Sequence, residues 1–184
     1  MNADLLNRAI IYATQAHAGQ MRKGTNLPYI VHPMEALAIV ATMTDDPEML
    51  AAAVLHDVVE DTAVTTDDVR REFGDRVAAL VTADTNTRKD KENTWHERKQ
   101  AAIERLSAAS YDEKMVALGD KLSNLRAITI DHEKHGEALW KRFNAPDGRT
   151  DIAWYYRGLA SALSDLKDTA PYHEYLTLLA KTFE

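Results

Sequence analysis

One segment of the chain, AAAVLHDVVEDT at residues 51–62, holds an imidazole and three carboxylates in an otherwise largely apolar run. If a helix continues through it, His56 lies one turn before Glu60, and Asp57 one turn before Asp61. Imidazoles and carboxylates bind divalent cations and also exchange protons with a substrate. A solvated helix end is the alternative interpretation of an HD pair. The second acidic pair, at matching turns, favours a functional site.

Two further segments have the same character. The sequence YIVHP places His32 at the start of a predicted helix, and GDKLSN places Asp120 inside an apolar helix. Taken alone, His32 could cap or pack, and Asp120 could pair with Lys121 or Lys114. The order of a histidine, a His-Asp pair and a distant aspartate resembles the ligand set of the HD metal-dependent phosphohydrolase superfamily.

Helical periodicity recurs almost throughout the chain, and alternating strand-like segments are nearly absent. The sequence of 184 residues has 45% hydrophobic residues, seven glycines and five prolines. This composition is typical of one soluble domain. We therefore expect residues 1–184 to form a single all-α domain of about eight to ten helices, and the resemblance implies that it is an HD domain. The absence of cysteine excludes thiolate metal sites and cysteine nucleophiles.

Capping residues predict how the site-bearing helices begin. Asp46 before Pro47 is typical of the N-cap of the helix that leads to the HD pair. Ser110 and Glu113 form a capping box at the start of the helix that carries Asp120. We predict further helices beginning near Pro33 and after Thr65, two last ones over about 150–168 and 172–182, and a loop from 84 to 93.

The charge balance is 22 Lys+Arg against 29 Asp+Glu, a net charge of −7. An acidic chain argues weakly against a nucleic-acid partner. The longest apolar stretch, residues 49–55, is far shorter than the roughly 18 residues that suggest a membrane span. Residues 1–20 lack the pattern of a signal peptide. We expect a cytoplasmic protein that acts on a small molecule.

Four stretches carry a closer resemblance: AHAGQMRKGTNLPYIVHP, AAAVLHDVVEDT, EFGDRVAALV and ALGDKLSNLRA. In this order they resemble the hydrolase domain of RelA/SpoT-type alarmone enzymes, and more narrowly the stand-alone small alarmone hydrolases. The resemblance implies hydrolysis without synthesis. The implied substrate is guanosine tetra- or pentaphosphate, (p)ppGpp, cleaved at its 3′ side to GDP or GTP and pyrophosphate.

The resemblance also implies a role for each residue of the site. A divalent metal, Mn²⁺ in this family, would be held by four ligands, and two further carboxylates would orient the attacking water or handle its proton. The implied ligands are His32, His56, Asp57 and Asp120, and the implied catalytic acids are Glu60 and Asp61.

Substrate contacts follow from the same resemblance. Arg22 would lie against the base, with Lys23 beside it, and Asn124 would lie near the nucleoside. Arg98 and Lys99, at the start of a predicted helix, would face phosphate. For Arg88, Lys89 and Lys91 a phosphate contact and a solvated loop are equally open, and Tyr155 and Tyr156 could pack in the core or close the pocket.

One departure concerns the base. Many family members carry a threonine where this chain has Ala127, and loss of one hydrogen-bond partner would weaken discrimination by on the order of 1 kcal/mol. Adenosine analogues, (p)ppApp, could then compete. The alternatives are another HD phosphohydrolase, such as a nucleotidase or cyclic-nucleotide phosphodiesterase, and a nucleotide-binding regulator without catalysis.

Overall fold

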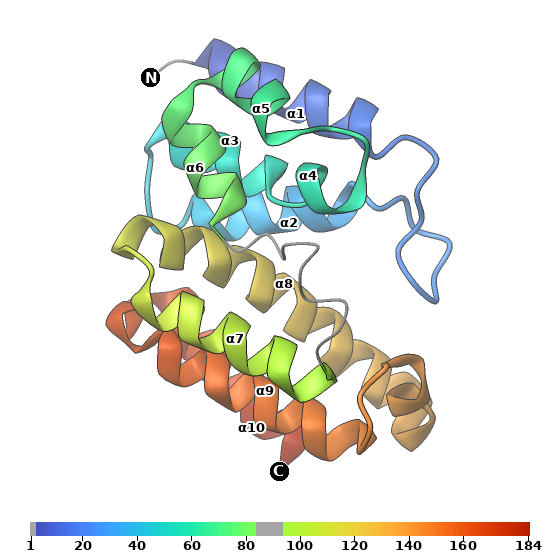
Figure 1. Ribbon diagram of the computed structural model, residues 1–184. Helices are drawn as coiled ribbons and strands as arrows, with labels where there is room; N and C mark the ends of the chain where they lie inside the picture. The colour runs from blue at the N-terminus through green and yellow to red at the C-terminus, as the bar shows by residue number, and fades with distance from the viewer. Residues whose placement is uncertain (1–2, 84–93) are drawn as a thin grey trace.

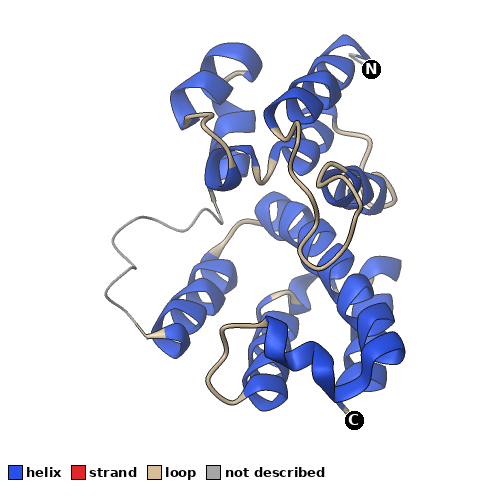
Figure 2. Cartoon of the chain, turned by 90° about the vertical axis from the view of Figure 1, so that its right-hand side faces the viewer, coloured by secondary structure: helices blue, strands red, loops and turns tan. Residues whose placement is uncertain are grey.

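The computed structural model describes residues 3–83 and 94–184, and all regular secondary structure within them is helical (Figures 1 and 2). One isolated β-bridge, between Met21 and Pro28, closes the loop that follows the first helix. The elements are α1 (Ala3–Ala16), α2 (Val31–Val40), α3 (Pro47–Leu55), α4 (Val58–Asp61), α5 (Thr66–Phe73), α6 (Asp75–Thr82), α7 (Trp95–Ala108), α8 (Tyr111–His135), η2 (Gly136–Arg142), α9 (Gly148–Ala162), η3 (Ser164–Leu166) and α10 (Ala170–Phe183). The predicted all-α class is confirmed.

The long helix α8 runs through the middle of the molecule (Figure 1). On one side it packs against α2 and α3, and on the other against α10. An apolar stripe of this helix is buried and consists of Met115, Leu118, Leu122 and Leu125. The central helix therefore supplies both core contacts and, through Asp120, one candidate ligand.

Within the described ranges, no helix is long and apolar enough to cross a membrane.

The predicted caps form. The Asp46 carboxylate accepts hydrogen bonds from the backbone N–H groups of Glu48 and Met49 at the start of α3. Ser110 and Glu113 form the reciprocal capping box of α8, and the Thr65 capping box begins α5. These caps fix where the helices that carry the site begin.

The helix expected to run through the HD pair is interrupted. Helix α3 ends at Leu55, and α4 begins at Val58 after a two-residue turn. The His56 ring explains the break, because its Nδ1 lies 2.8 Å from the Ala53 carbonyl oxygen. In a continuous helix that oxygen would accept the backbone N–H of Asp57. The helix does not continue through the HD pair, so the condition for two columns on one helix face is not met.

Other boundaries differ by small amounts. Helix α2 begins at Val31 instead of Pro33. Pro171 lies in the first turn of α10 instead of between the last two helices. The predicted loop at 84–93 lies outside the described residues.

A glycine lets α8 approach α2 closely. A Cβ atom added at Gly119 would lie 2.6 Å from Val40 Cγ2 and 2.9 Å from the Ala36 carbonyl oxygen. Both atoms belong to α2, which also carries His32. The absence of a side chain at Gly119 therefore brings the neighbouring Asp120 within reach of His32.

We predict that Gly119→Ala lowers the free energy of unfolding by about 1–3 kcal/mol, because the methyl group would overlap the backbone of α2. Gly158→Ala is the matched control, since its nearest neighbour is Ile103 Cδ1, the movable end of a side chain. Urea titrations followed by circular dichroism would compare the variants. Equal losses at the two sites would contradict this account of the α2–α8 contact.

Candidate active site

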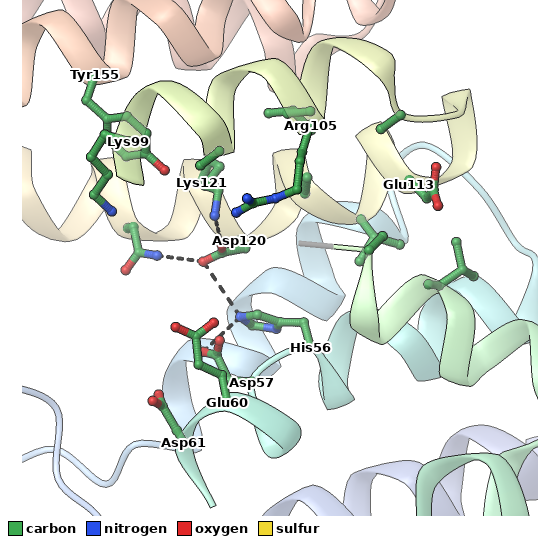
Figure 3. Close-up of a pocket in the computed structure, with 18 of the residues that line it drawn as sticks. His56, Asp57, Glu60, Asp61, Lys99, Arg105, Glu113, Asp120, Lys121 and Tyr155 are labelled. Carbon is green, nitrogen blue, oxygen red and sulfur yellow. Dashed lines mark hydrogen bonds and ion pairs between the residues drawn. The ribbon is translucent and has the colours of Figure 1, made fainter. Parts of the chain in front are cut away.

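Four side chains, from α2, from the α3–α4 turn and from α8, meet at one point (Figure 3 draws three of them). The Nε2 atoms of His32 and His56 are 3.2 Å apart. Asp57 Oδ2 lies 3.0 Å from His56 Nε2 and 3.5 Å from His32 Nε2. Asp120 Oδ1 lies 3.1 Å from His32 Nε2 and 3.6 Å from His56 Nε2. The structure thus brings all four predicted ligands together.

Hydrogen bonds on the far side of each imidazole fix how the rings face this cluster. His56 Nδ1 lies 2.8 Å from the Ala53 carbonyl, and His32 Nδ1 lies 2.8 Å from Ser123 Oγ. A carbonyl oxygen carries no proton, so Nδ1 of His56 is the donor. In the neutral ring, Nε2 then presents a lone pair to the cluster, as metal ligation requires.

The cluster concentrates negative charge. Burial disfavours a charged His56 ring, yet the carboxylates of Asp57 and Asp120 outweigh burial and hold the pKa of His56 well above its ordinary value. Burial would raise the pKa of Asp57, but His56 and His32 hold it well below its usual range. A positive charge at this point is therefore strongly favoured.

Asp120 uses its two oxygens differently. Its Oδ2 accepts from Lys121 Nζ at 2.7 Å, while Oδ1 faces the histidines and accepts from Asn124 Nδ2. Burial opposes ionisation, and Lys121, followed by His32, overcomes it and keeps the pKa of Asp120 well below its usual range. The carboxylate is thus held ionised and in one orientation.

Tyr29 fixes the other aspartate. Its hydroxyl donates to Asp57 Oδ2 at 2.7 Å. Burial, followed by the negative charge of Asp57, raises the pKa of Tyr29 well above its ordinary value. The phenol therefore stays protonated and remains a donor to the candidate ligand.

The donor set fits a divalent metal ion. Two imidazole nitrogens and two carboxylate oxygens are ligands for Mn²⁺, Fe²⁺, Co²⁺ or Zn²⁺. The ligand atoms of His32, His56 and Asp57 all lie within 4.8 Å of one another, and Asp120 adds the fourth. Acceptors brought this close repel one another unless a cation lies between them.

A cavity of about 260 Å³ opens beside the cluster (Figure 3). His56, Asp57 and Asp120 line it, and so do both predicted catalytic acids, Glu60 and Asp61. Lys99, Arg105 and Lys121 also line it, on the side opposite these acids, together with Glu113 and apolar residues. Acidic groups and basic groups therefore face the same space, an arrangement suited to a phosphate ester.

A second cavity, of about 350 Å³, adjoins the first through the shared residues Tyr29 and Asn124. It is lined by Arg22, Lys23, Ala127, Arg142 and Phe143, among others. Arg22 Nη2 donates to Asn124 Oδ1 at 3.2 Å, so two predicted nucleoside contacts touch. The second cavity therefore lies next to the first, and it also borders the basic loop.

Some of the remaining predicted residues line a cavity and others do not. Lys99 lines the first cavity, with its ammonium 4.4 Å from the centre of the Tyr155 ring, whereas Arg98 is not among the residues lining that cavity. Tyr155 and Tyr156 are buried, and they line the first and second cavity respectively. Packing and pocket lining are therefore compatible roles. Arg88, Lys89 and Lys91 lie outside the described residues.

Some residues at the site had no predicted role. Tyr29 lies three positions before His32, a spacing that places both on one side of a helical turn and was a usable signal. Lys121 was considered only as a partner of Asp120. Arg105 and Arg142 carry no signal in the sequence, because only the packing of α7 and η2 brings them to the cavities.

Comparison with known proteins agrees with this geometry. Residues 9–147 match the HD domain family. The chain belongs to the HD-domain family. This match covers every candidate ligand, and the family's divalent-metal chemistry agrees with the His-His-Asp cluster.

Curated relatives of this chain include enzymes named for pyrophosphate transfer to or from guanosine nucleotides. The chain is 32% identical over 142 residues to guanosine-3′,5′-bis(diphosphate) 3′-pyrophosphohydrolase of Aquifex aeolicus, covering 76% of this chain and 20% of the relative. It is 36% identical over 126 residues to GTP pyrophosphokinase of Streptomyces coelicolor, covering 67% and 14% respectively. The chain thus spans about a fifth of the length of such relatives, or less.

Solved structures match over more of their length. A metazoan orthologue of SpoT, described as hydrolysing ppGpp and acting in starvation responses, has a TM-score of 0.79 and 27% identity, covering 97% of this chain and 95% of its own. The protein lmo0812 of Listeria monocytogenes has a TM-score of 0.73 and 31% identity, covering 83% and 98%. The resemblance to RelA/SpoT-type hydrolase domains is confirmed.

We predict that His56→Ala and Asp57→Ala abolish retention of a divalent metal, because each removes a ligand, while Glu60→Ala retains the metal. Elemental analysis after dialysis measures the bound metal per chain. Glu60→Ala is also the matched control for loss of negative charge near the cluster. A metal-free Glu60 variant would show that Glu60 is itself a ligand.

Proposed function

We propose that this chain is a Mn²⁺-dependent hydrolase that removes the 3′-pyrophosphate of (p)ppGpp, giving GDP or GTP and pyrophosphate. The observation that carries the proposal is the four-ligand cluster of His32, His56, Asp57 and Asp120 beside the carboxylates of Glu60 and Asp61. The named activities of the relatives support the same reaction. We further propose that residues 1–184 act as one domain, in the cytoplasm.

The charge of the two cavities suits a substrate with phosphate on both sides of the bond that breaks. Arg22, Lys23 and Arg142 lie at one end, and Lys99, Arg105 and Lys121 at the other. In a chain with a net charge of −7, such gathering of cations favours a polyanionic ligand. The nucleoside would occupy the second cavity, with its 3′ group directed toward the metal cluster.

In the proposed reaction, water adds to the phosphorus bound to the 3′ oxygen, and the bond between that phosphorus and the 3′ oxygen breaks. Glu60 and Asp61 would orient the water and take up its proton, and a proton would pass to the departing 3′ oxygen to give the 3′ hydroxyl. The lysines and the arginine of the first cavity would bind the departing pyrophosphate. A bound divalent cation would lower the pKa of the water and neutralise negative charge on the phosphate.

Mn²⁺ is the proposed metal because the donor set combines nitrogen with oxygen ligands and the family resemblance points to it. The ligands His32, His56, Asp57 and Asp120 leave room for water and a substrate oxygen on an ion that prefers six partners. The chain's own part is to hold the ligand rings in fixed orientations, as the hydrogen bonds at Nδ1 of both imidazoles do.

The reaction is tested by incubating the protein with Mn²⁺ and, in separate tubes, ppGpp, ppApp, GTP, GDP and a cyclic dinucleotide. We expect pyrophosphate release from the 3′-pyrophosphorylated nucleotides, loss of that activity in EDTA and recovery with Mn²⁺. Anion-exchange chromatography resolves the products. Turnover of only the other nucleotides would indicate another HD phosphohydrolase, and no turnover in any tube would indicate a regulator.

Base preference is a separate prediction. Ala127 lines the second cavity and offers no hydroxyl to the base, so we expect ppApp to be hydrolysed as well as ppGpp. Ala127→Thr should raise the ratio of kcat/KM for ppGpp over ppApp by up to about tenfold, the effect of one hydrogen bond. A strong guanine preference in the unchanged protein would contradict the prediction.

A further inference from the structure

A line of hydrogen bonds leads away from the candidate ligand His32. Its Nδ1 lies 2.8 Å from Ser123 Oγ, and the Ser123 hydroxyl lies 2.7 Å from Glu35 Oε2. Arg126 Nη1 donates to Glu35 Oε1 at 3.0 Å. Arg126 also donates through Nε and Nη2 to the two carboxylate oxygens of Glu174, at 2.6 and 2.7 Å.

The Glu35 carboxylate decides which group donates in each of these hydrogen bonds. An ionised carboxylate only accepts, so the single proton of the Ser123 hydroxyl is given to Glu35. Ser123 Oγ can then only accept from His32, which requires the proton of the neutral ring to be on Nδ1. His32 Nε2 is left with its lone pair, and that atom faces the metal cluster.

His32 and Ser123 are buried, so few other partners can replace the hydrogen bond between them. The His32 side chain is 1% exposed and Ser123 is 0% exposed. Water therefore has no ready access to replace the hydroxyl, and a buried nitrogen without a partner is costly. His56 needs no such support, because a backbone carbonyl fixes its ring. The two ligand histidines are thus held by different means.

We propose that Ser123 and Glu35 are positioning residues that hold His32 in the tautomer that binds the metal. Arg126, clamped by Glu174 of α10, keeps the Glu35 carboxylate in place and paired. The inference rests on the proposed metal site and is independent of which nucleotide is cleaved. Mutation of a residue that hydrogen-bonds to a metal ligand commonly weakens metal affinity by about 10- to 100-fold.

The first test removes the hydroxyl. Ser123→Ala should weaken Mn²⁺ binding about 10- to 100-fold, measured without substrate by titration against a chromophoric chelator. At saturating Mn²⁺ its kcat should recover most of the wild-type value, because no ligand is lost. Thr129→Val is the matched control, since Thr129 is a buried hydroxyl of the same helix that bonds only Leu125 O and Thr182 Oγ1 among the described residues. It should leave Mn²⁺ affinity unchanged.

The second test keeps the size of the side chain and reverses the polarity. In Glu35→Gln, the amide oxygen should face the Arg126 donors and the amide N–H₂ should face Ser123. The Ser123 hydroxyl would then donate to His32 Nδ1, and the ring proton would move to Nε2. We expect weaker Mn²⁺ binding, measured without substrate by the same chelator titration.

The outcomes separate this inference from the proposed function. Wild-type affinity for Mn²⁺ in both Ser123→Ala and Glu35→Gln would overturn the positioning role while leaving the metal site and the reaction intact. A wild-type protein that binds no divalent cation would overturn the metal site and this inference together. Weakened binding in both variants, with Thr129→Val unaffected, is the expected result.

Discussion

Two imidazole nitrogens and two carboxylate oxygens face one another across about 3 to 3.6 Å, and much of the molecule serves to hold them there. Such atoms would separate if their helices were free to move. The close approach of α8 to α2 at Gly119 prevents this on one side. The turn at His56 prevents it on the other, because it directs the ring and the Asp57 carboxylate toward the same point. The buried stripe of α8 fixes both arrangements.

The residues around the cluster determine which ligand can bind beside it, and their charges favour a polyanion. Tyr29 and Asn124 belong to both cavities, and each also contacts a candidate metal ligand. The residues that the two cavities share therefore lie directly beside the cluster. The basic side chains at the two ends come from separate parts of the chain. Acidic and basic side chains thus line the same two neighbouring cavities.

The candidate site could be predicted from the sequence to the extent that its residues lie in local motifs. The HD pair, His32 and Asp120 are each marked by their neighbours, and the caps at Asp46 and Ser110 depend on residues three positions away at most. The break after Leu55 depends on one side-chain hydrogen bond that competes with the helix. Arg105 and the Ser123–Glu35 contact depend on how whole helices pack, which local patterns do not encode.

The order in which the ligands occur along the chain has a further consequence. Nearly half of the sequence lies between His32 and Asp120, so an ion bound by all four side chains closes two long loops of polypeptide. Closing a loop reduces the number of conformations open to the unfolded chain, and the reduction grows slowly with loop length. If it remains bound as the chain unfolds, the ion acts as a cross-link between the N-terminal helices and α8. In a chain without cysteine, such an ion would constrain the unfolded chain as a disulfide bond does in other proteins.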